Sequence, residues 1–243
     1  GLAPRCSGGV APRGAQDRAR ARGTDGHRLP GYRRDAKSDA QSTPSYRYFP
    51  STGGSITYNK TALWLNTMER WLGWPALQRI MSTHFDRSRF THPRPADFFG
   101  VVSDVTGQNL SWFFDQVYRS SNVFDYGVGE LHSARDGDQY RSSVVVRRYG
   151  EATFPVDVVV SFRNGDRITE HWDGKERWQS YRYDRPSPVL SAQVDPNRVL
   201  LLDVNYTNNS KTLEPRVIRA VTKWSLTGLI WLQDSLLSSA ALA

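Results

Sequence analysis

Residues 153–172 read TFPVDVVVSFRNGDRITEHW, and this stretch decides the fold class. Valine or phenylalanine occupies every second position from Phe154 to Phe162, which is the two-residue period of a strand with one buried face. Asn164-Gly165 follows, a dipeptide typical of a two-residue β-hairpin turn. Residues 167–172 then supply the returning strand. The sequence therefore predicts an antiparallel hairpin in this region.

Further short apolar or β-branched runs surround the hairpin. They are SSVVVRRYG at residues 142–150, WQSYRY at 178–183, VLSAQV at 189–194 and VLLLDV at 199–204. Arg185-Pro186 and Asp195-Pro196-Asn197 separate the last three runs, and proline and asparagine favour turns. Several strands at this spacing indicate an antiparallel β-sandwich, which we place at residues 127–210.

Residues 45–126 carry apolar side chains at a spacing of three and four, which is the period of amphipathic helices. Four helices are expected: over about residues 55–72, from Trp74-Pro75 onward, from Pro95 to Gly107, and within residues 109–121. Proline suits a first helical position, and glycine suits the residue just after a helix. Helices followed by an antiparallel β region make the predicted fold class α+β.

The first 44 residues differ in composition from the rest of the chain. Residues 1–44 hold nine Lys or Arg and four acidic residues, so they carry five of the eight net positive charges. They offer too little apolar surface to offset chain entropy, and we predict a disordered basic tail. Because the charge of the remaining residues is nearly balanced, no folded basic face is indicated and we expect no nucleic-acid partner.

The last segment, residues 211–243, is apolar but carries Gln233 and Asp234 within its hydrophobic run. A membrane-spanning helix needs about 20 predominantly apolar residues. The run instead indicates an amphipathic helix that packs on the protein or contacts a membrane surface. Cys6 is the single cysteine, which excludes an intrachain disulfide.

No self-contained catalytic motif occurs in the sequence. The chain has no H-E-x-x-H, no G-x-S-x-G and no P-loop. His84, Asp86 and His92 could be drawn as a set of metal ligands. However, His92 precedes Pro93 in a predicted loop, where nothing fixes its geometry. We therefore interpret these three side chains as polar surface residues, and we assign no metal ligand.

Five short motifs follow one another in the helical region. They are Tyr58-x-Lys60, Leu72-Gly73, Pro93-x-Pro95-x-Asp97-Phe98, Gly107-x-x-Leu110 and Phe113-Phe114-Asp115-Gln116. Their order and spacing resemble the region after the zinc site in gluzincin aminopeptidases, the membrane-alanyl-aminopeptidase-like zinc metallopeptidases. The later strands resemble the β-sandwich that follows the catalytic domain in bacterial members. The resemblance covers about residues 45–210, and it implies the helical C-terminal part of a thermolysin-like catalytic domain followed by that sandwich.

The resemblance implies a catalytic role for Tyr58, near the start of the first predicted helix. In the family, the matching phenol donates a hydrogen bond to the carbonyl oxygen that gains negative charge when zinc-activated water attacks the peptide bond. A tyrosine hydroxyl is protonated at neutral pH and can make this bond. The residues alone also allow an ordinary half-buried tyrosine bonded to the backbone. For Lys60 we expect a charge or packing role only.

The departures from the family concern its zinc site. Thr61 stands where the family has glycine, which is a mild change. The H-E-x-x-H helix, the downstream glutamate ligand and the G-x-M-E-N substrate loop lie before Y-x-K in the family and are absent here. We therefore expect no zinc bound to this chain and no activity from it alone.

The functional prediction is the C-terminal portion of a zinc metallopeptidase that hydrolyses peptide substrates at their N-terminus. The alternative is a non-catalytic module that binds a protein or a peptide. The resemblance and the apolar residues 211–243 suggest a periplasmic or membrane-associated parent protein.

Overall fold

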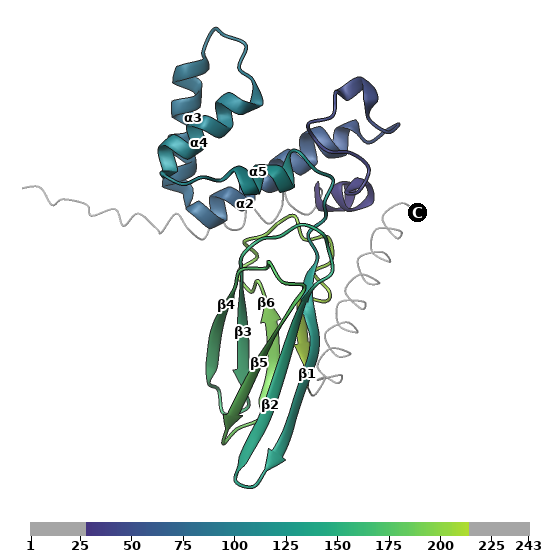
Figure 1. Ribbon diagram of the computed structural model, residues 1–243, viewed down its shortest axis with the longest axis vertical. Coiled ribbons are helices and arrows are strands. Elements are labelled where there is room, and N and C mark those ends of the chain that lie inside the picture. Colours follow the sequence, from purple (N-terminus) through teal and green to yellow (C-terminus); the bar gives the residue numbers. More distant parts are fainter. Residues whose placement is uncertain (1–27, 214–243) are drawn as a thin grey trace, which may run out of the picture.

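The computed structural model describes residues 28–213, in which helices are followed by two antiparallel sheets (Figure 1). Besides a helical stretch at residues 28–35, the helical elements are η1 (Ser45–Arg47), η2 (Ser55–Lys60), α2 (Thr61–Leu72), α3 (Trp74–Ser88), α4 (Pro95–Thr106) and α5 (Ser111–Val117). The strands are β1 (Tyr126–Asp136), β2 (Gln139–Arg148), β3 (Val156–Phe162), β4 (Arg167–Trp172), β5 (Trp178–Arg185), β6 (Val189–Val194) and β7 (Ser210–Thr212). The predicted α+β class is confirmed.

The predicted helix boundaries at Gly73, Pro95 and Gly107 are confirmed. Gly73 has a φ of 87° and separates α2 from α3, which carries a proline in its first turn. Gly107 lies in the left-handed region, with a φ of 67°, and ends α4. At the other end of α4, the Arg94 backbone N–H donates to Asp97 at 2.6 Å. These are local interactions, which a sequence pattern can reveal.

The strands form two sheets, ordered β1-β2-β5 and β4-β3-β6-β7, and their pairing is antiparallel as predicted. Alternate residues of β3, from Val156 to Phe162, are buried. Gly165 has a φ of 98° in the turn that leads to β4. The two-residue period in the sequence therefore identified the buried face of this strand.

The prediction of a strand at residues 199–204 is wrong. The buried Asp195 carboxylate accepts hydrogen bonds from the N–H groups of Val199 at 2.8 Å and Leu200 at 2.9 Å. The Leu201 N–H donates to Thr67 Oγ1 of α2 at 3.1 Å. These backbone groups therefore bond side chains instead of a neighbouring strand. The apolar run is buried, but it packs as a loop.

The prediction of a disordered tail through residue 44 is wrong for residues 28–44. Residues 28–35 are helical, and Tyr32 and Ala36 are buried in the core. The Ser42 N–H donates to the Tyr118 carbonyl at 2.9 Å. Composition underestimated the order of this segment because its few apolar side chains pack on residues far along the chain. Residues 1–27 lie outside the described part of the chain.

The C-terminal boundary also needs a small correction. Strand β7 includes residues 211–212, where the sequence predicts the start of a terminal helix. The remainder of that predicted amphipathic helix, residues 214–243, lies outside the described residues. Within residues 28–213, no helix is long and apolar enough to cross a membrane.

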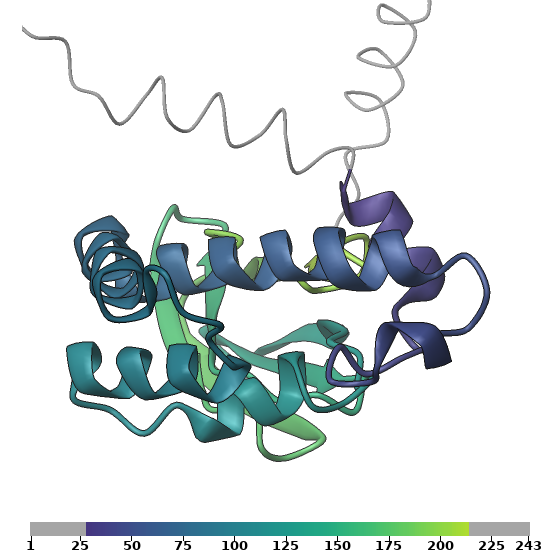
Figure 2. The same cartoon turned by 90° about the horizontal axis from the view of Figure 1, so that it is seen from above.

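The helices and the sheets share one hydrophobic core. The helices gather at one end of the sheets in Figure 1, and Figure 2 shows α2 crossing over that end. Phe154, just before β3, lies with its ring centroid 5.3 Å from Trp71 of α2 and 6.1 Å from Phe113 of α5. Aromatic pairs at such distances add to the stability gained from burial. The helical region is thereby held against the sheets.

Two backbone segments, at Val123 and Gly150, lie very close together where the helices meet the sheets, and this contact can be tested. A Cβ atom at Gly150 would lie 1.9 Å from the Val123 carbonyl oxygen, a backbone atom that cannot rotate away. We expect Gly150→Ala to lower the free energy of unfolding by about 2–4 kcal/mol, because the backbone must shift. Chemical denaturation monitored by circular dichroism would measure the change.

Gly100→Ala is the matched control. Gly100 lies within α4, and a Cβ atom added there would meet no other side chain or distant backbone atom within 4 Å. Alanine favours a helix interior, so this variant should gain up to about 1 kcal/mol. Equal stabilities of the two variants would show that the approach at Gly150 is not tight.

Candidate functional site

Tyr58, the sequence-predicted catalytic residue, lies in η2 at the entrance to the long helix α2. Its side chain is 75% exposed. Within the described part of the chain, no residue hydrogen-bonds its hydroxyl group. The alternative of a half-buried tyrosine bonded to backbone does not match this geometry. The phenol is free to donate a hydrogen bond to a ligand.

The turn that carries Tyr58 is π-helical and continues directly into the α-helix α2. The Thr61 N–H donates to the Tyr58 carbonyl, and the Thr61 hydroxyl donates to the Thr57 carbonyl at 2.5 Å. Gln41 Nε2 in turn donates to Thr61 Oγ1 at 2.6 Å. Short π-helical segments within α-helices are frequent at functional sites. Thr61 therefore has a structural role in this chain.

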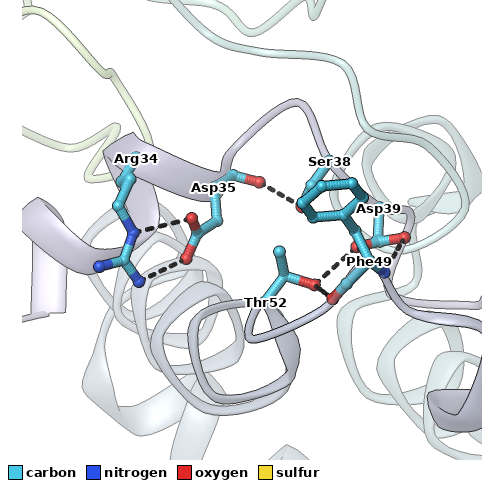
Figure 3. Close-up of polar contacts among 6 residues, drawn as sticks. All are labelled: Arg34, Asp35, Ser38, Asp39, Phe49 and Thr52. Carbon is cyan, nitrogen blue, oxygen red and sulfur yellow. Dashed lines mark hydrogen bonds and ion pairs between the residues drawn. The ribbon is translucent and has the colours of Figure 1, made fainter.

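Asp39 of the N-terminal region fixes the segment before η2, and Figure 3 shows its contacts beside those of Asp35. Asp39 accepts hydrogen bonds from Thr52 Oγ1 at 2.7 Å and from the Phe49 N–H at 3.1 Å. Asp35 pairs with Arg34, and this hydrogen bond, with a second from Ser55, lowers the pKa of Asp35. Residues 34–39, for which composition predicts disorder, therefore support the entrance to the candidate site.

Lys60 lies two residues after Tyr58 and is fully buried. Its ammonium group donates to the Ser120 carbonyl at 2.9 Å. No carboxylate of the described residues pairs with it, and burial lowers the pKa of Lys60 to about 8. Because buried lysines without a charged partner are rare, sequence reasoning missed this burial. Its partner, Ser120, is 60 residues away along the chain.

The described residues do not fit a zinc site. Among them, no three His, Cys, Asp or Glu side chains gather where they could hold a metal ion, and His84, Asp86 and His92 are not brought together. The His84 ring packs edge-on against Phe98, with centroids 5.2 Å apart. His171 lies elsewhere, on β4, with Nδ1 3.1 Å from Asp157 Oδ1.

The comparisons with known proteins find matches among solved structures alone. No protein-family model matches the chain, and no curated protein matches it. The structure is similar to Legionella pneumophila aminopeptidase A, which was crystallised in complex with aspartic acid, with a TM-score of 0.43 and 12% sequence identity. The match covers 60% of this chain but only 17% of the aminopeptidase chain. A likeness of this strength does not assign a family.

The buried Lys60 predicts how stability depends on pH. Its pKa is about 8 in the folded chain and about 10.4 when unfolded. Between these values the folded chain binds fewer protons, so the free energy of unfolding rises with pH. Relative to Lys60→Met, the natural chain should gain about 2 kcal/mol between pH 7 and pH 9.5. Urea denaturation at several pH values would measure this difference.

The Lys60→Met variant also serves as the reference in that experiment, because the buried tyrosines contribute equally to both proteins. Parallel stability curves for the two proteins would show that Lys60 is not buried as an uncompensated cation.

Proposed function

We propose that this chain forms the C-terminal part of a gluzincin-like aminopeptidase, in which Tyr58 hydrogen-bonds the reacting carbonyl oxygen of a peptide substrate. The observation that carries the proposal is the exposed phenol at the start of a helix, to which none of residues 28–213 makes a hydrogen bond. The order of the motifs from Tyr58 to Gln116 supports it further. In this proposal, Tyr58 contacts substrate, and Lys60 and Thr61 hold the turn.

The energetic contribution of such a phenol follows from where charge develops. A hydrogen bond that strengthens as an oxygen becomes negative stabilises the transition state more than the bound substrate. Removal of one donor of this kind typically costs about 3 kcal/mol, or a factor of 10²–10³ in kcat. Such a donor must already be oriented before the reaction, and the hydrogen bonds around η2 hold Tyr58 in one orientation.

The proposal requires polypeptide beyond the described residues. Zinc, when bound in the parent enzyme, would activate the attacking water, but the side chains of residues 28–213 do not form a site for it. We therefore place the ligands in a segment that carries H-E-x-x-H and packs near Tyr58. Zinc is thus a cofactor of the complete enzyme in this proposal, and the substrate is a peptide.

The proposal also interprets the two structural regions. Helices η2 to α5 correspond to the end of a thermolysin-like domain, and the two sheets correspond to the β-sandwich after it. Val144 and Val146 of β2 and Val158 and Val160 of β3 all belong to one core. Each sheet thus contributes a buried face, as the layers of a sandwich do.

A non-catalytic binding module remains the second candidate, because one helix face is apolar and exposed. Trp74, Met81 and Phe85 of α3 are 57%, 46% and 65% exposed. Their spacing of seven and four residues places them on one side of the helix. Exposed apolar patches mark protein-interaction sites in many proteins.

The catalytic proposal predicts the effect of Tyr58→Phe in the gene product that includes the zinc-binding segment. Loss of the hydroxyl should lower kcat about 100-fold with little change in KM, because the bond acts mainly in the transition state. The zinc content should stay the same. Steady-state hydrolysis of aminoacyl-p-nitroanilides and elemental analysis would measure both.

Tyr149→Phe is the control, since Tyr149 is also exposed but follows β2. Unchanged kcat in Tyr58→Phe would contradict the role of Tyr58. A ratio of one zinc per 243-residue chain after dialysis would contradict the division of the site between segments.

A further inference from the structure

Tyr58 and Lys60 lie on opposite sides of the same helical turn. Two residues apart in an α-helix means about 200° of rotation, and the wider π-helical turn keeps such a pair on opposite faces. Accordingly, Tyr58 is 75% exposed and Lys60 is 0% exposed. The rotation of η2 that buries Lys60 is therefore the same rotation that directs Tyr58 outward.

Only one described atom accepts a hydrogen bond from the Lys60 ammonium, the Ser120 carbonyl oxygen at 2.9 Å. Ser120 lies just after α5, in the connection to β1. Its own hydroxyl donates to the Gln116 carbonyl at 2.8 Å, so this connection is itself fixed to α5. The contact therefore joins the turn that carries Tyr58 to the end of α5.

Fixing a turn with a buried lysine lowers the stability of the fold. An unpaired buried cation opposes folding, and an apolar side chain of similar length would fill the same space without that cost. A methionine, however, gives no directional bond and would allow η2 to rotate. The burial of the charge is explained if the direction of the hydrogen bond matters more to the protein than the stability lost by burying a cation.

We propose that Lys60 is the positioning residue for Tyr58: its bond to the Ser120 carbonyl sets the rotation of η2 and so directs the phenol outward. The catalytic part of this inference rests on the function proposed above, but the rotation itself does not. The Thr61 side chain supplies a second fixed point through Gln41. Lys60 acts inside the core and Thr61 acts on the flank of the same turn.

The rotation can be tested on the full 243-residue chain without any catalytic assay. Mild iodination followed by peptide mass spectrometry would compare the labelling rate of Tyr58 with that of Tyr46, which is 80% exposed. In Lys60→Met, a shift of one residue would rotate the phenol by about 100°, so the relative rate of Tyr58 should fall at least about threefold. An unchanged ratio in the folded variant would overturn the inference.

Arg148→Met is the matched control for general loosening. Arg148 is also a buried cation bonded to carbonyl oxygens, among them those of Gly174 and Gly150, and it lies in the sheets. This variant should leave the Tyr58 ratio unchanged. If Lys60→Met does not unfold cooperatively, Lys60→Leu replaces it and likewise carries no N–H donor. An unchanged ratio in that variant would overturn the inference equally.

A double-mutant cycle in the complete peptidase tests the catalytic part. In the enzyme that keeps Tyr58, Lys60→Met should lower kcat about tenfold. In the Tyr58→Phe background it should lower kcat less than about twofold, because no hydroxyl is left to position. Equal effects in both backgrounds would show that Lys60 acts on the fold alone. If labelling changes but Tyr58→Phe leaves kcat unaltered, the proposed function fails while the positioning of Tyr58 by Lys60 stands.

Discussion

Phe154 joins the two regions of the structure. It precedes β3, yet its ring packs among Trp71 of α2 and Trp112 and Phe113 of α5. The same two helices hold the ends of the Lys60–Ser120 contact, since α2 continues η2 and Ser120 follows α5. Separation of α2 from α5 would therefore expose aromatic surface and remove the partner of a buried cation together. The orientation of Tyr58 depends on this packing, although Tyr58 contributes little to it.

Local pattern predicted the elements whose own residues determine them. The alternation in β3, the turn at Gly165 and the helix end at Gly107 depend on a few neighbouring positions, and the structure confirms them. The run at residues 199–204 has the same apolar character, but Asp195 and Thr67 bond its N–H groups and make it a loop. Apolar content thus predicted burial there, while the conformation depended on partners outside the run.

The candidate site was predictable in part for the same reason. The place of Tyr58 at a helix start was visible in the sequence, whereas its catalytic role, which its motif implies, stays a prediction. The burial of Lys60 was not predictable, because it depends on a carbonyl group 60 residues away. The role of residues 34–41 was missed because a basic, apolar-poor segment is normally disordered. Asp35, Asp39 and Gln41 give it partners in and beside η2, namely Ser55, Thr52 and Thr61, which composition does not record.

Three independent contacts restrain the turn that carries Tyr58, and none of them needs a ligand. Asp39 holds Thr52 on the approach, Gln41 holds Thr61 on the flank, and Ser120 holds Lys60 in the core. A donor that is already oriented loses little entropy on binding and needs no reorganisation as charge develops. In the role proposed for Tyr58, fixing the phenol in advance lowers stability at Lys60, where a cation is buried, and reduces the entropy lost when the phenol binds an anionic or carbonyl oxygen. Lower folding stability in exchange for an oriented donor is the pattern expected of a binding group whose partner comes from outside residues 28–213.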